Sequence, residues 1–188
     1  MPLHLGPDRV TRETIAVFAV FGVGGQIAVA GLGVSAALRG LGLTRALDVV
    51  RSGLGGYELW LGFVVAALAT GGSLFFSEIA HFVPCELCWY ERICMYPLAV
   101  VMLLLAVAND YRPLRYLWPL PLAGAGVSLY HLLVERGVVA QPRACALSAP
   151  GGCATRWIDE FGYVTIPVLS LTAFALLLGL FWLAGADE

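Results

Sequence analysis

The chain has no lysine and little charge of either sign. All eleven of its basic residues are arginine, and charged residues make up 13% of its 188 positions. The net charge of -2 offers no excess of positive charge to a polyanion, so a role in binding nucleic acid is not expected. Hydrophobic residues, in contrast, make up 60% of the chain. This composition predicts a protein embedded in membrane lipid.

Long apolar stretches recur along the sequence. A membrane helix needs about 20 apolar residues, and each stretch comes near that length. They cover about 15–38, 57–80, 89–108, 114–135 and 163–184. We therefore expect an all-α, polytopic membrane protein with five membrane helices.

The first apolar stretch is preceded by Arg9 and Arg12 and interrupted by glycines. A cleaved signal peptide has a similar basic start, but its apolar region is shorter, at about 7 to 15 residues. A retained helix is therefore the preferred prediction. The segment 41–54 that follows has leucines spaced for one helical face, and it is expected to lie along the inner membrane surface.

Arginine in short connections predicts the orientation of the chain. Two such connections contain or adjoin Arg39, Arg45, Arg51, Arg112 and Arg115. Short loops rich in arginine stay on the cytoplasmic side. The alternation of helices then places residues 84–88 and 137–162 on the extracytoplasmic face, with the acidic tail 186–188 inside.

The five cysteines point to redox chemistry. Cys85 and Cys88 form a C-x-x-C dithiol, which can close into a disulfide or bind a metal. Cys145 and Cys153 lie in a loop with glycine and proline, where a structural disulfide is one interpretation. Two pairs on one membrane face also permit thiol–disulfide exchange, which passes electrons without another cofactor. Cys94 falls inside a span and is expected to be a buried hydrophobic residue.

Cys88 is expected at the start of a helix that begins near Trp89. Unpaired amides and the helix dipole favour a thiolate there, so Cys88 is predicted to be the better nucleophile of its pair. Arg92 lies one turn further along the same face, where its fixed charge would stabilise an anion. Because an arginine within a membrane span is costly, Arg92 either reaches lipid headgroups or serves a function, such as donating to an oxygen of a quinone.

A specific signature occupies residues 84–97, with the sequence PCELCWYERICMYP. It resembles that of the DsbB/BdbC family of disulfide-bond-formation proteins, which are bacterial membrane thiol oxidases. The resemblance covers about residues 57–184 and includes His131 after a tyrosine. It implies a four-helix bundle at 57–184 in the bacterial cytoplasmic membrane. Residues 1–56 have no counterpart in that pattern and are expected to form an additional N-terminal membrane helix and an inner-surface segment, with 185–188 as a cytoplasmic tail.

The resemblance also implies a route for electrons through the two cysteine pairs. Cys145 would form a mixed disulfide with a thioredoxin-like extracytoplasmic partner, and Cys153 would exchange with Cys85. Cys88 would then deliver electrons to a membrane quinone, either ubiquinone or menaquinone. In the same comparison Arg92 matches the quinone-side arginine of the family.

His131 matches a family position near the quinone ring, and no metal is expected in such a site.

Three alternatives remain open. A vitamin K epoxide reductase-like protein has similar parts, but its loop pair precedes the C-x-x-C pair in the chain. His81 and His131 could ligate a haem iron, and the four paired cysteines could bind zinc.

Overall fold

In a computed structural model of the chain, residues 9–40 and 45–185 are described, and they form helices joined by loops. The elements are α1 (Arg9–Gly40), α2 (Arg45–Leu54), α3 (Glu58–Leu74), the π-helical turn η1 (Phe75–Ile79), α4 (Glu86–Ala108), α5 (Leu114–Leu117), α6 (Pro119–Glu135), α7 (Arg143–Ser148), the 3-10 turn η2 (Gly152–Ala154) and α8 (Ile166–Ala184).

Five helical stretches in the described part of the chain are long and apolar enough to cross a bilayer. They are Arg9–Leu38, Glu58–Ile79, Glu86–Ala108, Leu114–Glu135 and Ile166–Ala184. The predicted all-α fold with five membrane helices, one of them N-terminal, is therefore confirmed, and the chain is a multi-pass membrane protein. The surface helix expected at 41–54 corresponds to α2, although 41–44 and the acidic tail 186–188 lie outside the described residues.

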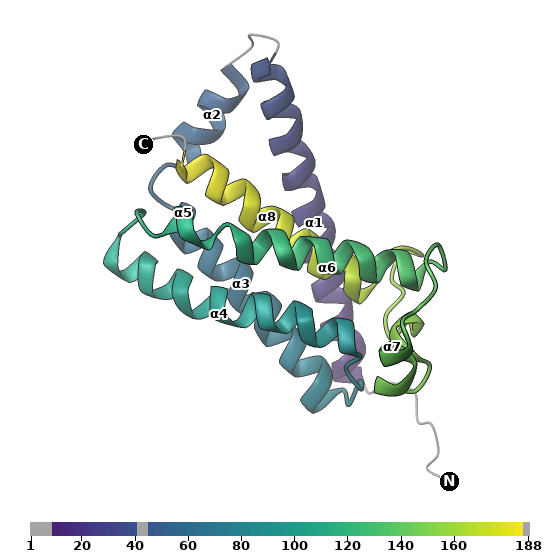
Figure 1. Cartoon of the computed structure of the whole chain (residues 1–188). Helices are drawn as coiled ribbons and strands as arrows, with labels where there is room; N and C mark the ends of the chain where they lie inside the picture. Colours follow the sequence, from purple (N-terminus) through teal and green to yellow (C-terminus); the bar gives the residue numbers. More distant parts are fainter. Residues whose placement is uncertain (1–8, 41–44, 186–188) are drawn as a thin grey trace.

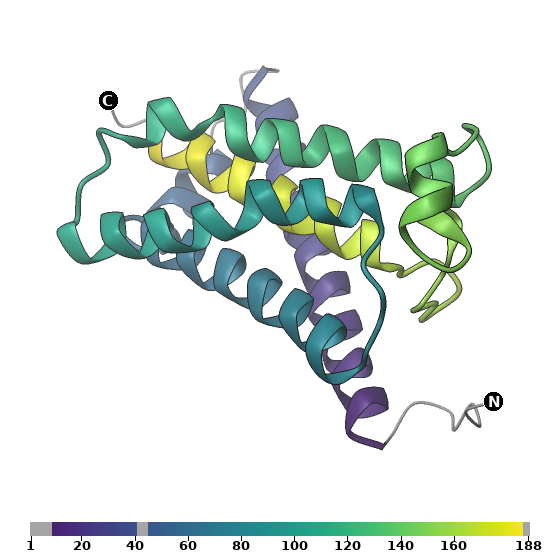
Figure 2. The ribbon, with the colours of Figure 1, turned by 60° about the horizontal axis from the view of Figure 1, so that its bottom comes forward.

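Helices α3, α4, α6 and α8 run together as a bundle, and α1 crosses it obliquely (Figures 1 and 2). Leu98 and Met102 of α4 and Phe174 and Leu177 of α8 are almost completely buried between these helices. Between α6 and α8, Gly124 lies directly against the ring of Phe174. Lipid-embedded helices pack through such small residues, which let the two backbones approach.

Glycines also position α1 on the bundle. A β-carbon added at Gly25 would lie 3.0 Å from side-chain atoms of Leu176 and Thr172, and one at Gly22 would collide with Leu169. These contacts set α1 against α8. Two of the glycines that interrupt the apolar pattern, Gly22 and Gly25, are thus packing positions of the helix.

Both cysteine-bearing segments lie at one end of the bundle, which we call the cysteine end. Helix α4 begins there, and the connection between α6 and α8, with α7 and η2, packs over it (Figure 1). Arg156 of this connection lies 3.6 Å from the buried Glu135 carboxylate at the end of α6, and Arg136 donates to the backbone carbonyl of Tyr163. These contacts tie the long connection to the bundle.

The packing of α6 on α8 predicts that alanine substitutions at two glycines of α6 have different effects on stability. Gly124→Ala should lower the free energy of unfolding by about 1–3 kcal/mol relative to Gly126→Ala, because the added methyl group overlaps the buried ring of Phe174. Gly126 is the matched control, since nothing lies within 4 Å of a β-carbon there and the gain in helix propensity is the same. Chemical denaturation in detergent micelles measures the difference; equal stabilities would contradict close packing at Gly124.

Candidate active site

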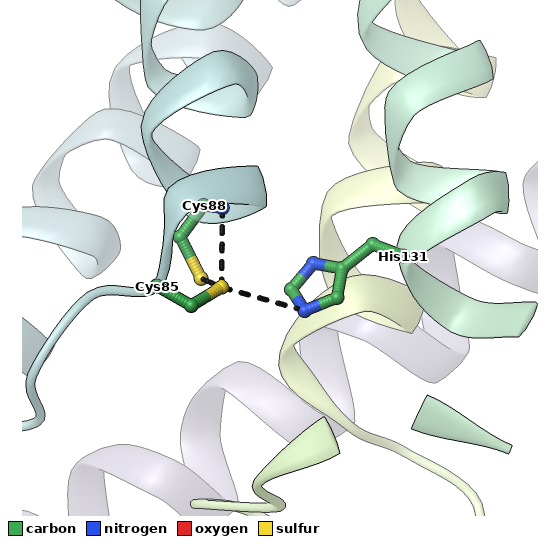
Figure 3. A group of neighbouring side chains, drawn as sticks. All are labelled: Cys85, Cys88 and His131. Carbon is green, nitrogen blue, oxygen red and sulfur yellow. Dashed lines mark hydrogen bonds between the residues drawn. The ribbon is translucent and has the colours of Figure 1, made fainter. Parts of the chain in front are cut away.

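Cys85 is the N-cap residue of α4. Its Sγ accepts a hydrogen bond from the backbone amide of Cys88 at 3.3 Å, and the two free thiols lie 2.8 Å apart (Figure 3). The hydrogen bond from the Cys88 side chain and the neighbouring His131 together lower the pKa of Cys85 to about 5, against the opposing effect of burial. The expectation that Cys88 holds the better-stabilised thiolate is wrong for this geometry. The helix begins at Glu86 instead of near Trp89, so the capping position belongs to Cys85.

His131 of α6 joins the C-x-x-C pair to the second cysteine loop. Its Nε2 lies 3.6 Å from Cys85 Sγ and 3.2 Å from the backbone carbonyl oxygen of Cys153 (Figure 3). Its Nδ1 lies 3.0 Å from the carboxylate of Glu91, and both side chains are buried. Ionisable groups in a membrane span are paired in this way. The imidazole is therefore placed to exchange a proton with the sulfur of Cys85.

Glu91 is a site residue that the sequence analysis missed. It lies three residues after Cys88, so it faces the same side of α4 as the dithiol. A carboxylate inside an apolar span is by itself a signal of function. That signal was available in the sequence, but its partner, 40 residues away in the chain, was not.

The second cysteine pair is a disulfide, Cys145–Cys153, and both residues are only 1% exposed. They belong to the same buried cluster as Cys85, with Cys88 packed against it. Ser148 fastens this loop to the start of α4, since its Oγ accepts from the amide of Glu86 at 3.1 Å and donates to the carbonyl of Cys145 at 2.9 Å. The structure therefore brings all four predicted catalytic cysteines together, while Cys94 packs half-buried against the main core.

Arg92 lies on the other side of the dithiol, at a cavity of about 660 Å³ between α1, α3, α4 and α8, here called the lateral cavity. Its guanidinium donates to the backbone carbonyl of Ser73 at 3.1 Å and lies 5.1 Å from the ring centroid of Trp89. Cys88 also lines the lateral cavity, and most of the other lining residues are apolar. His131 is not among the described residues that line it. Arg92 and His131, both expected beside one ligand, thus lie on different sides of the dithiol.

Two alternative sites are disfavoured by this geometry. A zinc site of four cysteines needs four thiolates, but Cys145 and Cys153 are bonded to each other. A haem needs an unengaged imidazole nitrogen, but both nitrogens of His131 have neighbours within hydrogen-bonding range. The atoms of Cys85, Cys88 and His131 do lie within 4.8 Å of one another, as metal ligands would. Their arrangement equally suits thiol chemistry assisted by a base.

Comparison with known proteins gives consistent matches. The family model "Disulfide bond formation protein DsbB" matches residues 58–184. A probable disulfide formation protein of Deinococcus radiodurans is 45% identical over 130 residues, which cover 65% of this chain and 85% of that protein. Disulfide bond formation protein C of Bacillus subtilis (strain 168) is 40% identical over 125 residues, covering 64% and 86%. A probable disulfide formation protein of Metapseudomonas resinovorans is 34% identical over 127 residues, covering 67% and 88%. No solved structure matches the chain.

The capped position of Cys85 predicts an unusual pH dependence. In the reduced protein, the rate of alkylation of Cys85 should rise with pH around a midpoint of about 5, because the thiolate is the reactive form and its pKa is lowered. Replacing His131 by alanine should move this midpoint upward, since one source of thiolate stabilisation is lost. Peptide mass spectrometry after short exposure to iodoacetamide measures the rate for Cys85 alone. A wild-type midpoint near the ordinary thiol value of about 8.5 would contradict the assignment.

Proposed function

The chain belongs to the DsbB family of disulfide bond formation proteins, and on this premise we propose that it is a quinone-dependent thiol oxidase that reoxidises a thioredoxin-like partner. The observation that carries the proposal is the packing of two cysteine pairs around His131, beside a mostly apolar cavity lined by Cys88 and Arg92. One side of the dithiol thus adjoins a second disulfide, and the other adjoins space suited to a lipophilic electron acceptor.

The partner side of the reaction uses the Cys145–Cys153 disulfide. A thiolate of the reduced partner attacks Cys145, forming a mixed disulfide and releasing Cys153 as a thiolate. The second thiol of the partner then attacks the partner's sulfur in the mixed disulfide. The partner leaves with a disulfide, and Cys145 is released as a thiolate. Cys145 is 1% exposed, so α7 must move before a protein can reach it. The hydrogen bond from the Glu86 amide to Ser148 resists that movement.

The exchange between pairs moves two electrons inward. From a closed Cys85–Cys88 disulfide, the Cys153 thiolate attacks Cys85, and Cys88 leaves as a thiolate. Cys145 then attacks Cys153, which closes the loop pair again and releases Cys85. His131 lies next to the Cys85 sulfur and can accept the proton of the Cys85 thiol or return it during this step. The structure has a closed loop pair and two free C-x-x-C thiols, the pairing that this exchange produces.

The lateral cavity has the character expected of a quinone site. Its lining is mostly apolar, and Arg92 at its edge has guanidinium N–H groups beyond the one that it gives to Ser73. In this proposal Arg92 donates to a quinone carbonyl oxygen, and Cys88 provides the sulfur nearest that ligand. When bound, a quinone supplies an acceptor for the two electrons and two protons that are released as Cys85 and Cys88 close.

We also propose that the cysteine end faces the extracytoplasmic side, where disulfide-forming partners act. Support comes from Arg112 and Arg115, in a short connection at the far end of α4 from the dithiol. Arginine in short connections favours the cytoplasmic side. On this orientation a soluble partner meets the loop that carries Cys145, and the lateral cavity opens toward lipid below it.

Two substitutions separate the halves of the proposed reaction. Dithiothreitol serves as the dithiol and a short-tailed ubiquinone as the acceptor, with quinone absorbance as the readout. Cys88→Ser should abolish turnover. Arg92→Ala should raise the KM for quinone by about 10- to 100-fold, the effect of losing a hydrogen bond from a charged group, while reduction of Cys145–Cys153 by dithiothreitol keeps its wild-type rate. Wild-type turnover by Cys88→Ser, or equal loss of both half-reactions in Arg92→Ala, would contradict these roles.

Access to the loop disulfide should depend on Ser148. Ser148→Ala removes the one hydrogen bond that joins α7 to the start of α4, from the Glu86 amide, at roughly 1 kcal/mol, so reduction of Cys145–Cys153 by dithiothreitol should accelerate about fivefold. Thr155→Ala is the control, because it removes one hydrogen bond within the loop, to Pro150, that does not reach α4. Rates come from quenched samples analysed for free thiols. Equal rates in the two variants would mean that α7 does not control access.

A further inference from the structure

Helix α1 lies outside the region 58–184 that matches the family, yet it forms one side of the lateral cavity. We propose that α1 completes a channel for the apolar tail of the quinone whose ring lies beside Cys88 and Arg92. This inference rests on the proposed function and adds to it a binding surface that the four-helix bundle does not itself contain. The ligand class is a quinone with a long hydrocarbon tail.

The position of α1 leaves room for such a tail. Gly22 and Gly25 hold one face of α1 against α8, as described above. Nearer the cysteine end, the ring of Phe18 lies 2.7 Å from a β-carbon position at Gly72 of α3, and its centroid is 5.6 Å from that of Phe76. Helix α1 is therefore fixed to α8 along one face and to the end of α3, and the lateral cavity lies between these contacts.

The lining changes in character along the length of the cavity. Beside Cys88 it includes the guanidinium of Arg92 and the hydroxyl groups of Ser73 and Tyr96, which are hydrogen-bonded to each other. From Ser73 toward the middle of α3, the α3 lining residues are Val64, Val65, Leu68, Ala69 and Gly72. Eight residues separate Ser73 from Val65, which is about 12 Å along a helix axis. A polar end followed by a long apolar stretch fits a quinone ring followed by its tail.

Beyond Phe21, the residues of α1 that line this stretch are small. Gly24 and Ala28 both line the cavity and carry little or no side chain, and nothing lies within 4 Å of a β-carbon position at Gly24. A hydrocarbon chain can therefore lie directly along the helix backbone. At the cysteine end, Trp157 of the second loop stacks on Phe82 at 5.1 Å, and both rings line the cavity. The tail is thus directed away from the loop, toward the centre of the membrane.

The test is to narrow the channel from the α1 side without touching the ring end. Gly24→Leu and Ala28→Leu add bulk to the cavity wall. Gly31→Leu and Ala30→Leu are the matched controls, because both positions are exposed on the same helix and do not line the cavity. Each full-length variant is purified in mild detergent. The quinone that it retains is extracted and quantified, and turnover is measured with ubiquinones of one and of eight isoprene units.

Gly24→Leu and Ala28→Leu should retain several-fold less quinone than their controls. Their KM for the long-tailed ubiquinone should rise about tenfold, equal to about 1.4 kcal/mol of lost binding energy, with the KM for the short-tailed one unchanged. Equal values in variants and controls would overturn the inference, and so would an equal rise for both tail lengths. If wild-type protein reduced neither ubiquinone nor a menaquinone analogue, the proposed function itself would fail, an outcome distinct from the loss of tail discrimination.

Discussion

A single buried imidazole, that of His131, connects the two cysteine pairs. One of its nitrogens meets Cys85 and the backbone of Cys153, and the other meets Glu91. Removing any of these neighbours would leave a polar or charged group unpaired in apolar surroundings, which costs several kcal/mol for a charge. The pairing of the buried Glu91 and the contact between Cys85 and the second loop both depend on this arrangement.

The dithiol lies between two environments of opposite character. Toward the second loop it faces polar groups that can hold a proton or receive a thiolate. Toward the lipid it faces the mostly apolar lateral cavity, whose lining also includes Glu91 and Arg92. In the proposed function, this separation would let one pair of sulfurs serve a soluble protein and a lipophilic molecule in turn. Each reactant would approach from its own side, and the two electrons would pass through the sulfur pair between them.

The sequence predicted the number and approximate extents of the membrane helices because hydrocarbon thickness sets their length. It also predicted the cysteine pairs, since their signature is contiguous. The start of α4 was misplaced because the usual N-cap residues are serine, threonine, aspartate and asparagine, and here a cysteine sulfur accepts the hydrogen bond. The partners of His131 could not be predicted from the sequence, because pairing between helices does not follow from spacing within one helix. The division of the chain at residue 56 stays a prediction.

In the proposed relay, electrons pass from Cys153 to Cys85. The most direct measurement is to trap that bond in a Cys88→Ser, Cys145→Ser variant, in which neither remaining sulfur has its usual partner. After mild oxidation and digestion, mass spectrometry should find Cys85 and Cys153 joined as the main intramolecular disulfide, with Cys94 free. A dominant link from either cysteine to Cys94, or no intramolecular link under conditions that close Cys145–Cys153 in the wild type, would contradict the two-pair relay.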